Sequence, residues 1–216
     1  KGESEKYIGE NENWDLAEEA LKNALEQKEL KYTREEGEAK FYGPAIDIKI
    51  KDALGRGWQG PTIQVDFNLP ERFDVNYIAS DGKKHKVVMV HRTVLGAMER
   101  FVGCLLEHYA GDFPLWLAPT QVKVLPITDA HDEYSKKIKD QLAEIGIRAD
   151  CDLRNEKTGF KIREGNLEKI PYLLIIGDRE LEEETVSVRS RKNGDEGSLP
   201  LSEFLVRVER EAKDKA

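Results

Sequence analysis

The stretch KVVMVHRTVLGAMERF, residues 86–101, decides the fold that we predict for the first half of this chain. It begins with a run of apolar, mainly β-branched residues at 87–90, which is too short for a helix and typical of a buried strand. From Thr93 onward, apolar residues recur at the three-and-four spacing of a helix that ends near residue 108, and Thr93 is a suitable N-cap. We therefore expect a strand that runs directly into a helix.

The expected junction carries groups that can bind a ligand. His91 supplies an imidazole, Gly96 leaves the backbone open to close approach, and Arg100 projects one turn later. This combination is typical of a site for a nucleotide and a substrate. From the residues alone, however, Arg100 also fits a solvent-exposed arginine beside Glu99, and His91 also fits a hydrogen-bonded core histidine.

Polar residues also lie along the strands that we expect before residues 86–101. Residues 46–51 alternate between apolar and polar, which predicts a half-buried strand, and residues 62–69 form the next strand after a turn-rich segment at 55–61. Three polar side chains share one face of that second strand: Thr62, Gln64 and Asp66. Such a face is either the solvent-exposed side of an antiparallel sheet or part of a functional site. A hairpin turn is expected at 80–82.

Outside these strands, the first half contains a surface helix at 14–27 capped by Asn13 and a short strand candidate at 31–33. A Pro-bounded aromatic hinge at 111–119 separates it from a second half in which strands and helices alternate. There we expect strands at 122–126, 148–153, 172–176 and 185–189, and helices at 132–145, at 159–169 and from Ser202 onward. The predicted class is α+β for residues 1–116, an antiparallel sheet with helices, and α/β for residues 117–216, a mostly parallel mixed sheet.

Composition narrows the classes of function. The chain has 216 residues, a formal net charge of −8 and 35% charged residues of both signs, which argues against a general binder of polyanions but not against a selective RNA partner. No apolar run approaches the length of a membrane span and no leader is visible, so we expect a cytoplasmic protein without a membrane partner. The only cysteines, Cys104 and Cys151, are expected to be buried thiols without a disulfide.

Six residues of the first half are expected at strand faces or strand ends of one sheet: Tyr42, Gln59, Thr62, Gln64, His91 and Arg100. They offer neutral donors and acceptors, one imidazole and one cation. Paired carboxylates, a Ser/His/Asp order and a glycine-rich phosphate loop are not found in the sequence. Such a site positions a polar ligand and stabilises phosphate charge rather than attacking covalently.

Several stretches, in order, resemble one family. HRTVLGAMERF resembles motif 3 of class II aminoacyl-tRNA synthetases, which places that motif at about 87–101, and FYGP and WQGPTIQVDFNLPERF resemble the threonyl-tRNA synthetases in particular. FPLWLAPTQVKVLPI, DLRNEKTGFKIRE, PYLLIIGDRE and VSVRSR are similar to that family's anticodon-binding domain. Prolyl and histidyl enzymes fit less well, because His91-Arg92 and WQGPTIQ do not resemble their motifs.

The resemblance implies ATP-dependent formation of threonyl-adenylate and transfer of threonine to its tRNA, with Mg²⁺-bound ATP as a substrate. It implies that Arg100, Gln64 and Tyr42 are catalytic-site residues, with Gln64 and Tyr42 lining the amino-acid pocket. Gln59 and Thr62, together with Arg100, would bind ATP.

The resemblance also implies a zinc ion that binds the amino and hydroxyl groups of threonine, with His91 as one of three protein ligands. Because valine matches threonine in shape, a metal that requires a hydroxyl ligand rejects valine as an apolar pocket cannot. In the second half, Asn155, Glu180 and Arg189, with Arg163 nearby, resemble the residues that read the anticodon.

The chain departs from the family in several respects. Motifs 1 and 2, the other zinc ligands and the editing region are expected to lie before residue 1, so the chain resembles the C-terminal part of an enzyme that is a homodimer at full length. The zinc ligand set in this chain is thus incomplete, and we expect the isolated segment to be inactive. Ala45 stands where the family usually has lysine, and Ala97 where serine is frequent. These departures leave an alternative open, a non-catalytic or regulatory relative that binds the tRNA anticodon.

Overall fold

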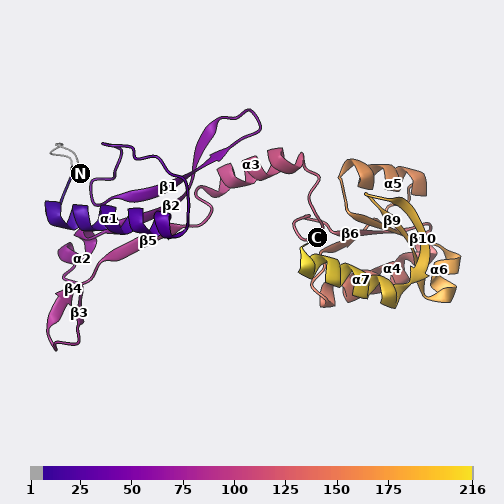
Figure 1. Ribbon diagram of the computed structural model, residues 1–216. Helices are drawn as coiled ribbons and strands as arrows, with labels where there is room; N and C mark the ends of the chain where they lie inside the picture. Colours follow the sequence, from indigo (N-terminus) through magenta and orange to yellow (C-terminus); the bar gives the residue numbers. More distant parts are fainter. Residues whose placement is uncertain (1–6, 216) are drawn as a thin grey trace. The chain divides into compact units, whose positions relative to one another are not determined.

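The computed structural model describes residues 7–215, and the chain divides into two compact units, residues 1–108 and 109–216 (Figure 1). Across residues 7–215, every helix falls short of the length and apolar character that a membrane crossing requires.

The first unit is built on a three-stranded antiparallel sheet of order β1-β2-β5, formed by Ala45–Lys51, Gly57–Asp66 and Met89–Thr93. Helix α1 (Asn11–Gln27) contributes the fully buried Trp14, whose ring contacts Phe67 just after β2 edge-on. Since Phe67 and the buried Val65 alternate with the polar residues of β2, α1 packs toward the apolar face and leaves the polar face to other groups.

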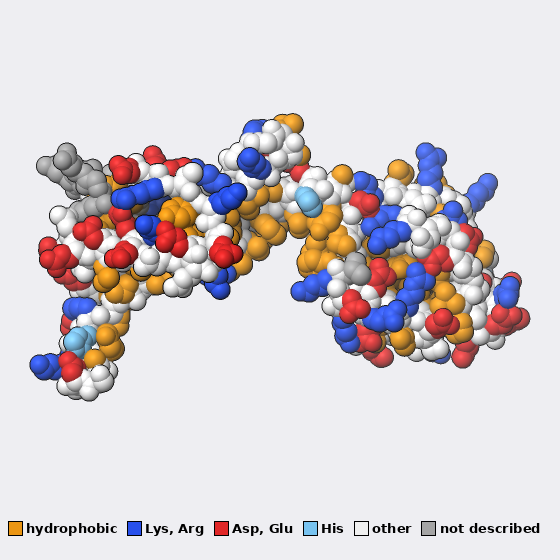
Figure 2. All heavy atoms as spheres, in the orientation of Figure 1, with side chains coloured by type: hydrophobic (Ala, Val, Ile, Leu, Met, Phe, Trp, Pro, Cys, Tyr) orange, Lys and Arg blue, Asp and Glu red, His pale blue; other side chains and the backbone are white. Residues whose placement is uncertain are grey.

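Three further elements complete the first unit: α2 (Asn68–Arg72), the hairpin β3-β4 (Asn76–Ile78 and Lys84–Lys86) and α3 (Met98–Tyr109). The turn expected at 80–82 is confirmed, since β3 and β4 pair across it. Helix α3 contributes no buried residue, and apolar side chains such as Met98, Val102 and Leu106 lie exposed along it (Figure 2).

The strand-to-helix junction lies further along the chain than predicted. β5 extends to Thr93, and α3 begins only at Met98. Between them Gly96 has a φ of +73°, and a Cβ at this position would lie 2.8 Å from the carbonyl oxygen of Gly60. A left-handed glycine pressed against β2 cannot continue a helix, so the predicted helix start at Thr93 was wrong. His91 therefore lies inside β5 and not at its end.

Three more expectations for the first unit were wrong. Residues 31–33 have no regular structure, and the segment expected as turn contains the first half of β2, where Trp58 pairs with Ile50. Pro61 is tolerated in this strand because the register with β1 shifts nearby and the pairing with β5 begins only at Thr62. Residues 68–72 form α2 instead of continuing the strand expected to residue 69.

The second unit is a five-stranded mixed sheet of order β10-β9-β8-β6-β7. Its elements are β6 (Val122–Pro126), a short 3-10 turn η1 (Asp129–His131), α4 (Asp132–Glu144), β7 (Ala149–Cys151), α5 (Thr158–Leu167), β8 (Tyr172–Ile176), α6 (Asp178–Glu183), β9 (Thr185–Ser190), β10 (Gly194–Pro200) and α7 (Leu201–Asp214). β6 is parallel to β7 and β8, whereas β8-β9 and β9-β10 are antiparallel.

Helices cover both faces of this sheet, as expected. Helices α4 and α7 pack on one face through residues such as Ile138 and Phe204, and α5 lies on the other face, where Ile162 packs against Leu125 and Leu173 (Figure 1). The expected α+β and α/β classes are confirmed, and β6 and β8 have the predicted bounds. Cys104 and Cys151 form no disulfide, but both are half-buried and not buried as expected.

Candidate functional site

The polar face of the β1-β2-β5 sheet gathers most of the residues predicted for the first site. Gln64 lies opposite Ala45 of β1 and His91 of β5, and Thr62 lies opposite Asp47 and Thr93 in the next row. Because directly paired residues of an antiparallel sheet point to the same side, these two rows of three side chains share one face. The sheet register thus brings distant parts of the sequence together.

Gln64 is the most buried of the predicted site residues on this face, with 6% of its surface exposed. Its Oε1 accepts a hydrogen bond of 3.1 Å from the hydroxyl of Tyr42, whereas its Nε2 has no partner among the described residues. A buried donor without a partner costs about 1–3 kcal/mol, so a ligand that brings an acceptor recovers that free energy.

Tyr42 is held in place by the glycine that follows it. The backbone of Gly43 passes so close to β2 that a Cβ would lie 1.9 Å from the carbonyl oxygen of Val65. The next residue, Pro44, accepts a backbone hydrogen bond of 3.1 Å from Val65. The sequence FYGP therefore fixes the loop against β2 and directs the Tyr42 hydroxyl to Gln64.

Asp47 organises the second row. Its Oδ1 accepts hydrogen bonds from the Nε2 of Gln59, at 2.9 Å, and from the hydroxyl of Thr62. This carboxylate fixes which end of the Gln59 amide faces the sheet. The sequence prediction omitted Asp47, although the alternation of residues 46–51 already placed it on the polar side of its strand.

Arg100 reaches the same region from α3. Its Nη1 donates to the carbonyl oxygen of Gln59 at 2.8 Å, and its guanidinium lies 5.4 Å from the centre of the Trp58 ring. Trp58 is itself anchored, because its indole Nε1 donates to Asp52 at 2.9 Å. That hydrogen bond, followed by those of Arg56, lowers the pKa of Asp52 to about 2. Arg100 is exposed, and the remaining N–H groups of its fork are available to an anion.

His91 is held by Asp66. The ring Nε2 lies 2.8 Å from Oδ2 of Asp66, a carboxylate that is fully buried and that also accepts the backbone N–H groups of Asn68 and Leu69 through Oδ1. Metal-binding histidines are commonly fixed in this way, with a carboxylate on one ring nitrogen and the metal on the other. His91 can thus offer its Nδ1 to a metal.

A complete zinc site needs three or four protein ligands, and this requirement limits what the chain supplies. Within residues 7–215, no group of three or more His, Cys, Asp or Glu side chains is placed to hold a metal ion. His91, with Asp66 behind it, can thus serve as one ligand of a metal ion.

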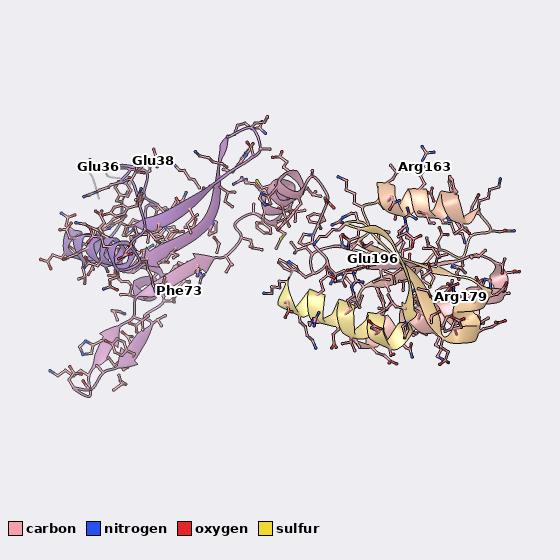
Figure 3. The ribbon with its side chains drawn as sticks, turned by 45° about the vertical axis from the view of Figure 1, so that its right-hand side comes forward. Glu36, Glu38, Phe73, Arg163, Arg179 and Glu196 are labelled. Atoms are coloured by element: carbon pink, nitrogen blue, oxygen red, sulfur yellow. The ribbon has the colours of Figure 1, made fainter. Side chains whose placement is uncertain are left out.

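The residues predicted to read an anticodon lie at different places on the second unit. Asn155 follows β7 and Glu180 follows β8, so both lie at the carboxyl-terminal edge of these parallel strands. Arg189 lies on β9, opposite Leu173 near the start of β8, and Arg163 projects from the outer side of α5 (Figure 3).

Their local environments also differ. Asn155 is exposed and makes no side-chain hydrogen bond with the described residues, and half-buried Arg189 makes none either. Glu180 has a structural role already, because its Oε2 accepts the backbone N–H of Gly177 at 3.0 Å and caps α6. The structure therefore brings Asn155 and Glu180 to one edge but does not gather all four residues there.

Two family models match the chain, one in each unit. Residues 5–109 match the class II tRNA synthetase core domain of the G, H, P, S and T enzymes, and residues 121–211 match an anticodon binding domain. The fold and the motifs together define a class II aminoacyl-tRNA synthetase core followed by an anticodon-binding domain.

Comparison with individual proteins shows which enzymes of this class the chain resembles. The chain is 54% identical over 211 residues to a threonine--tRNA ligase of Clostridium acetobutylicum and 53% identical over 211 residues to that of Acetivibrio thermocellus, in each case over 98% of this chain and 33% of the relative. The solved RNA binding domain of threonyl-tRNA synthetase from Cryptosporidium parvum superimposes with a TM-score of 0.86 at 36% identity, over 95% of this chain and 52% of that one. The chain belongs to the threonyl-tRNA synthetase family and spans about a third of the length of the curated relatives that it matches.

Proposed function

We propose that this chain is part of an enzyme that joins threonine to its tRNA. Residues 1–116 would supply the C-terminal part of the catalytic domain, and residues 117–216 the anticodon-binding domain. The observation that carries the proposal is the buried amide of Gln64, whose Nε2 lacks a partner and which lies in one row with His91 on the polar face of the sheet. A buried donor without a partner costs free energy, and a polar ligand that accepts a hydrogen bond from it would recover that cost.

The proposed reaction consumes threonine and ATP with its Mg²⁺, and forms threonyl-adenylate and pyrophosphate before threonine passes to the tRNA. Gln64 and Tyr42 act on threonine, because their hydrogen bond holds the Gln64 amide with its free N–H toward the site. Gln59 and Thr62 bind the nucleotide, and Asp47 fixes their orientation through its hydrogen bonds to both side chains. Arg100 presents its free guanidinium N–H groups to phosphate charge as it develops.

In this proposal His91 is one ligand of a zinc ion. The metal, when bound, supplies a position that only an amino acid with a hydroxyl group can fill. The contribution of this chain is to hold the imidazole: Asp66 fixes one ring nitrogen and directs the other outward.

The proposed partner of the second unit is the anticodon loop of threonine tRNA, read by Asn155, Glu180 and Arg189, with Arg163 available to the RNA backbone. Amide, carboxylate and guanidinium groups recognise the edges of unpaired bases. The unpartnered side chains of exposed Asn155 and half-buried Arg189 support this role more directly than Glu180, which caps α6. We further propose that the full-length enzyme is a cytoplasmic homodimer.

Ala45 supports a second candidate, a relative that binds tRNA without catalysing. It lies opposite Gln64 in the first row, so the lysine usual in the family would project onto the same polar face. Loss of that cation weakens contact with a charged substrate.

Binding of synthetic RNA hairpins tests the RNA-reading part, which both candidates share. The chain is titrated with the anticodon stem-loop of threonine tRNA and with a hairpin of the same stem in which one anticodon base is exchanged. We expect affinity for the altered hairpin to fall about tenfold or more, the effect of one lost base contact. Equal affinity for the two hairpins would remove the anticodon role.

A further inference from the structure

The loop at 152–157 combines one free side chain with neighbours that are tightly held. Asn155 is exposed and makes no side-chain hydrogen bond with the described residues. The residues around it are fixed to β6, β7 and α5. A flexible surface loop would show the opposite pattern, with few fixed side chains.

Arg154 forms the first of these attachments. Its fork binds both oxygens of Asp152, with Nε to Oδ1 at 2.8 Å and Nη2 to Oδ2 at 2.6 Å, and it also pairs with Glu164 of α5. The Asp152 side chain is 4% exposed, and the guanidinium lowers the pKa of its carboxyl group. A two-pronged contact of this kind fixes direction as well as distance.

Lys161 forms the second attachment, from inside α5. It is 3% exposed, and its Nζ donates to the carbonyl oxygen of Pro126 at 3.0 Å and to that of Asp152 at 2.9 Å. These carbonyl groups lie at the ends of β6 and β7. Lysine is rarely buried unless it is paired, because its amino group loses hydration. Here it joins two strand ends to one helix.

The two attachments act on the same loop from both sides. Lys161 fixes the point where the chain leaves β7, and Arg154, the residue directly before Asn155, is itself fixed to Asp152. Arg163, further along α5, projects outward instead, so the same helix presents one cation to solvent and one to the loop (Figure 3).

We propose that Lys161 and Arg154 are positioning residues that hold the Asn155 amide in the orientation needed to read an anticodon base. This inference rests on the anticodon role proposed above. Preorganised groups bind more selectively, because the cost of ordering the loop is already met in the free protein.

The test uses the full chain and two threonine tRNA anticodon stem-loops, one unaltered and one with the base read by Asn155 exchanged. That base is first identified as the one whose exchange weakens binding to the unaltered chain but not to Asn155→Ala. The measured quantity is the ratio of the two affinities in Lys161→Met, Asn155→Ala and the double variant. Lys123→Met is the matched control, because Lys123 also joins a sheet strand to α5, but through Glu168 at the far end of that helix.

We expect Asn155→Ala and Lys161→Met each to reduce the affinity ratio about tenfold, the effect of one lost hydrogen bond, and the double variant to lose no more than either. Lys123→Met should leave the ratio within about twofold, since it removes no contact of the loop. Arg154→Lys keeps the charge but loses the two-pronged contact with Asp152, so it should reduce the affinity ratio by less than tenfold. This variant replaces Lys161→Met in the test if Lys161→Met does not fold.

Amide hydrogen exchange of residues 153–157 in the free protein separates the two hypotheses. Faster exchange in Lys161→Met but not in Lys123→Met supports the positioning role, unless the affinity ratio falls in Asn155→Ala and is unchanged in Lys161→Met. If Asn155→Ala leaves the affinity ratio unchanged, the anticodon role is wrong and hydrogen exchange alone decides the positioning. Unchanged exchange and an unchanged ratio in Lys161→Met, with a reduced ratio in Asn155→Ala, would overturn the inference.

Discussion

Two glutamines are buried within residues 7–215, and they differ in whether their amides have hydrogen-bond partners. Gln121 donates to the carbonyl oxygen of Leu115 and accepts the backbone N–H of Arg148, whereas Nε2 of Gln64 has no partner among the described residues. Burial is similar, at 2% and 6% exposed, so the difference lies in hydrogen bonding. Gln121 joins backbone segments, whereas Gln64 has a free donor that our proposal assigns to a ligand.

We therefore predict opposite effects of the same substitution. Gln64→Met should raise the free energy of unfolding by up to about 1 kcal/mol, because removing a buried donor without a partner outweighs the loss of the hydrogen bond from the half-buried Tyr42 hydroxyl, which can turn to water. Gln121→Met should lower it by about 2 kcal/mol, because two backbone groups lose their partners. Urea unfolding measures both. A destabilising Gln64→Met would indicate that Gln64 has a structural role and would weaken the proposed site.

Gly43 allows a second prediction at the residue scale. Gly43→Ala places a methyl group against the carbonyl oxygen of Val65, so the loop that carries Tyr42 must move. We expect a loss of about 2–4 kcal/mol in unfolding free energy. Gly103→Ala, on α3 with open space around it, is the control and should be neutral or slightly stabilising. A neutral Gly43→Ala would show that the close approach to β2 is not required.

At this scale the sequence indicates part of the candidate site. Alternation of polar residues along β2 correctly places Thr62 and Gln64 on one side of the strand, because side chains of a strand point alternately to its two faces. It does not reveal that Asp47 binds Gln59 and Thr62, or that Asp66 binds His91, because these contacts depend on sheet register between distant segments.

At the scale of elements, one charged network attaches α7 to the sheet. Arg207 of α7 pairs with Glu196 of β10 and donates to the Tyr172 hydroxyl at 3.1 Å, and that hydroxyl donates to Glu211 at 2.6 Å. The hydrogen bond from the Arg207 guanidinium is the main cause that lowers the pKa of Glu196 to about 2. Desolvation, followed by Glu211, raises the pKa of Tyr172 to about 12.

This network should make stability depend on pH. The pKa of Glu196 is about 2 in the folded protein and 4.5 ordinarily, so its contribution is complete above about pH 4.5 and is lost as pH falls from there toward 2. Allowing for solvent screening, we expect the Glu196→Gln variant to be less stable by about 1–2 kcal/mol at pH 6, with the difference disappearing near pH 2. Denaturant unfolding at both pH values measures this. A difference that is the same at pH 6 and pH 2 would contradict the assignment.

The elements themselves were predictable to different degrees. β6 and β8 are continuous apolar runs between turn signals, and their bounds followed from the sequence. The start of α3 could not be predicted from the sequence. Apolar residues keep a helical spacing through residues 94–97, but Gly96 adopts a positive φ against Gly60 and the helix begins only after it. The first half of β2 contains glycine and proline, and only its pairing with β1 makes it a strand.

At the scale of the whole molecule, the second unit contains its own core. All residues of its two hydrophobic clusters lie between Leu115 and Ala212. In the first unit, β5 is an edge strand with exposed Val90, and α3 buries none of its side chains. We expect residues 109–216 alone to fold and to unfold in a single cooperative transition, and residues 1–108 alone to be markedly less stable. Calorimetry of the two fragments checks this. A first fragment of equal stability would contradict it.

The central claim is that this chain is a working part of a threonine-tRNA ligase. The most direct test is a chimera in which it replaces the matching third of the Clostridium acetobutylicum threonine--tRNA ligase, to which it is 54% identical. The measurement is threonine-dependent pyrophosphate exchange and charging of threonine tRNA, with Gln64→Met and Ala45→Lys compared in the same chimera. We predict a chimera that charges threonine tRNA, loses tenfold or more in exchange with Gln64→Met, and gains with Ala45→Lys. A folded chimera that binds threonine tRNA but supports neither exchange nor charging, even with Ala45→Lys, would contradict the claim.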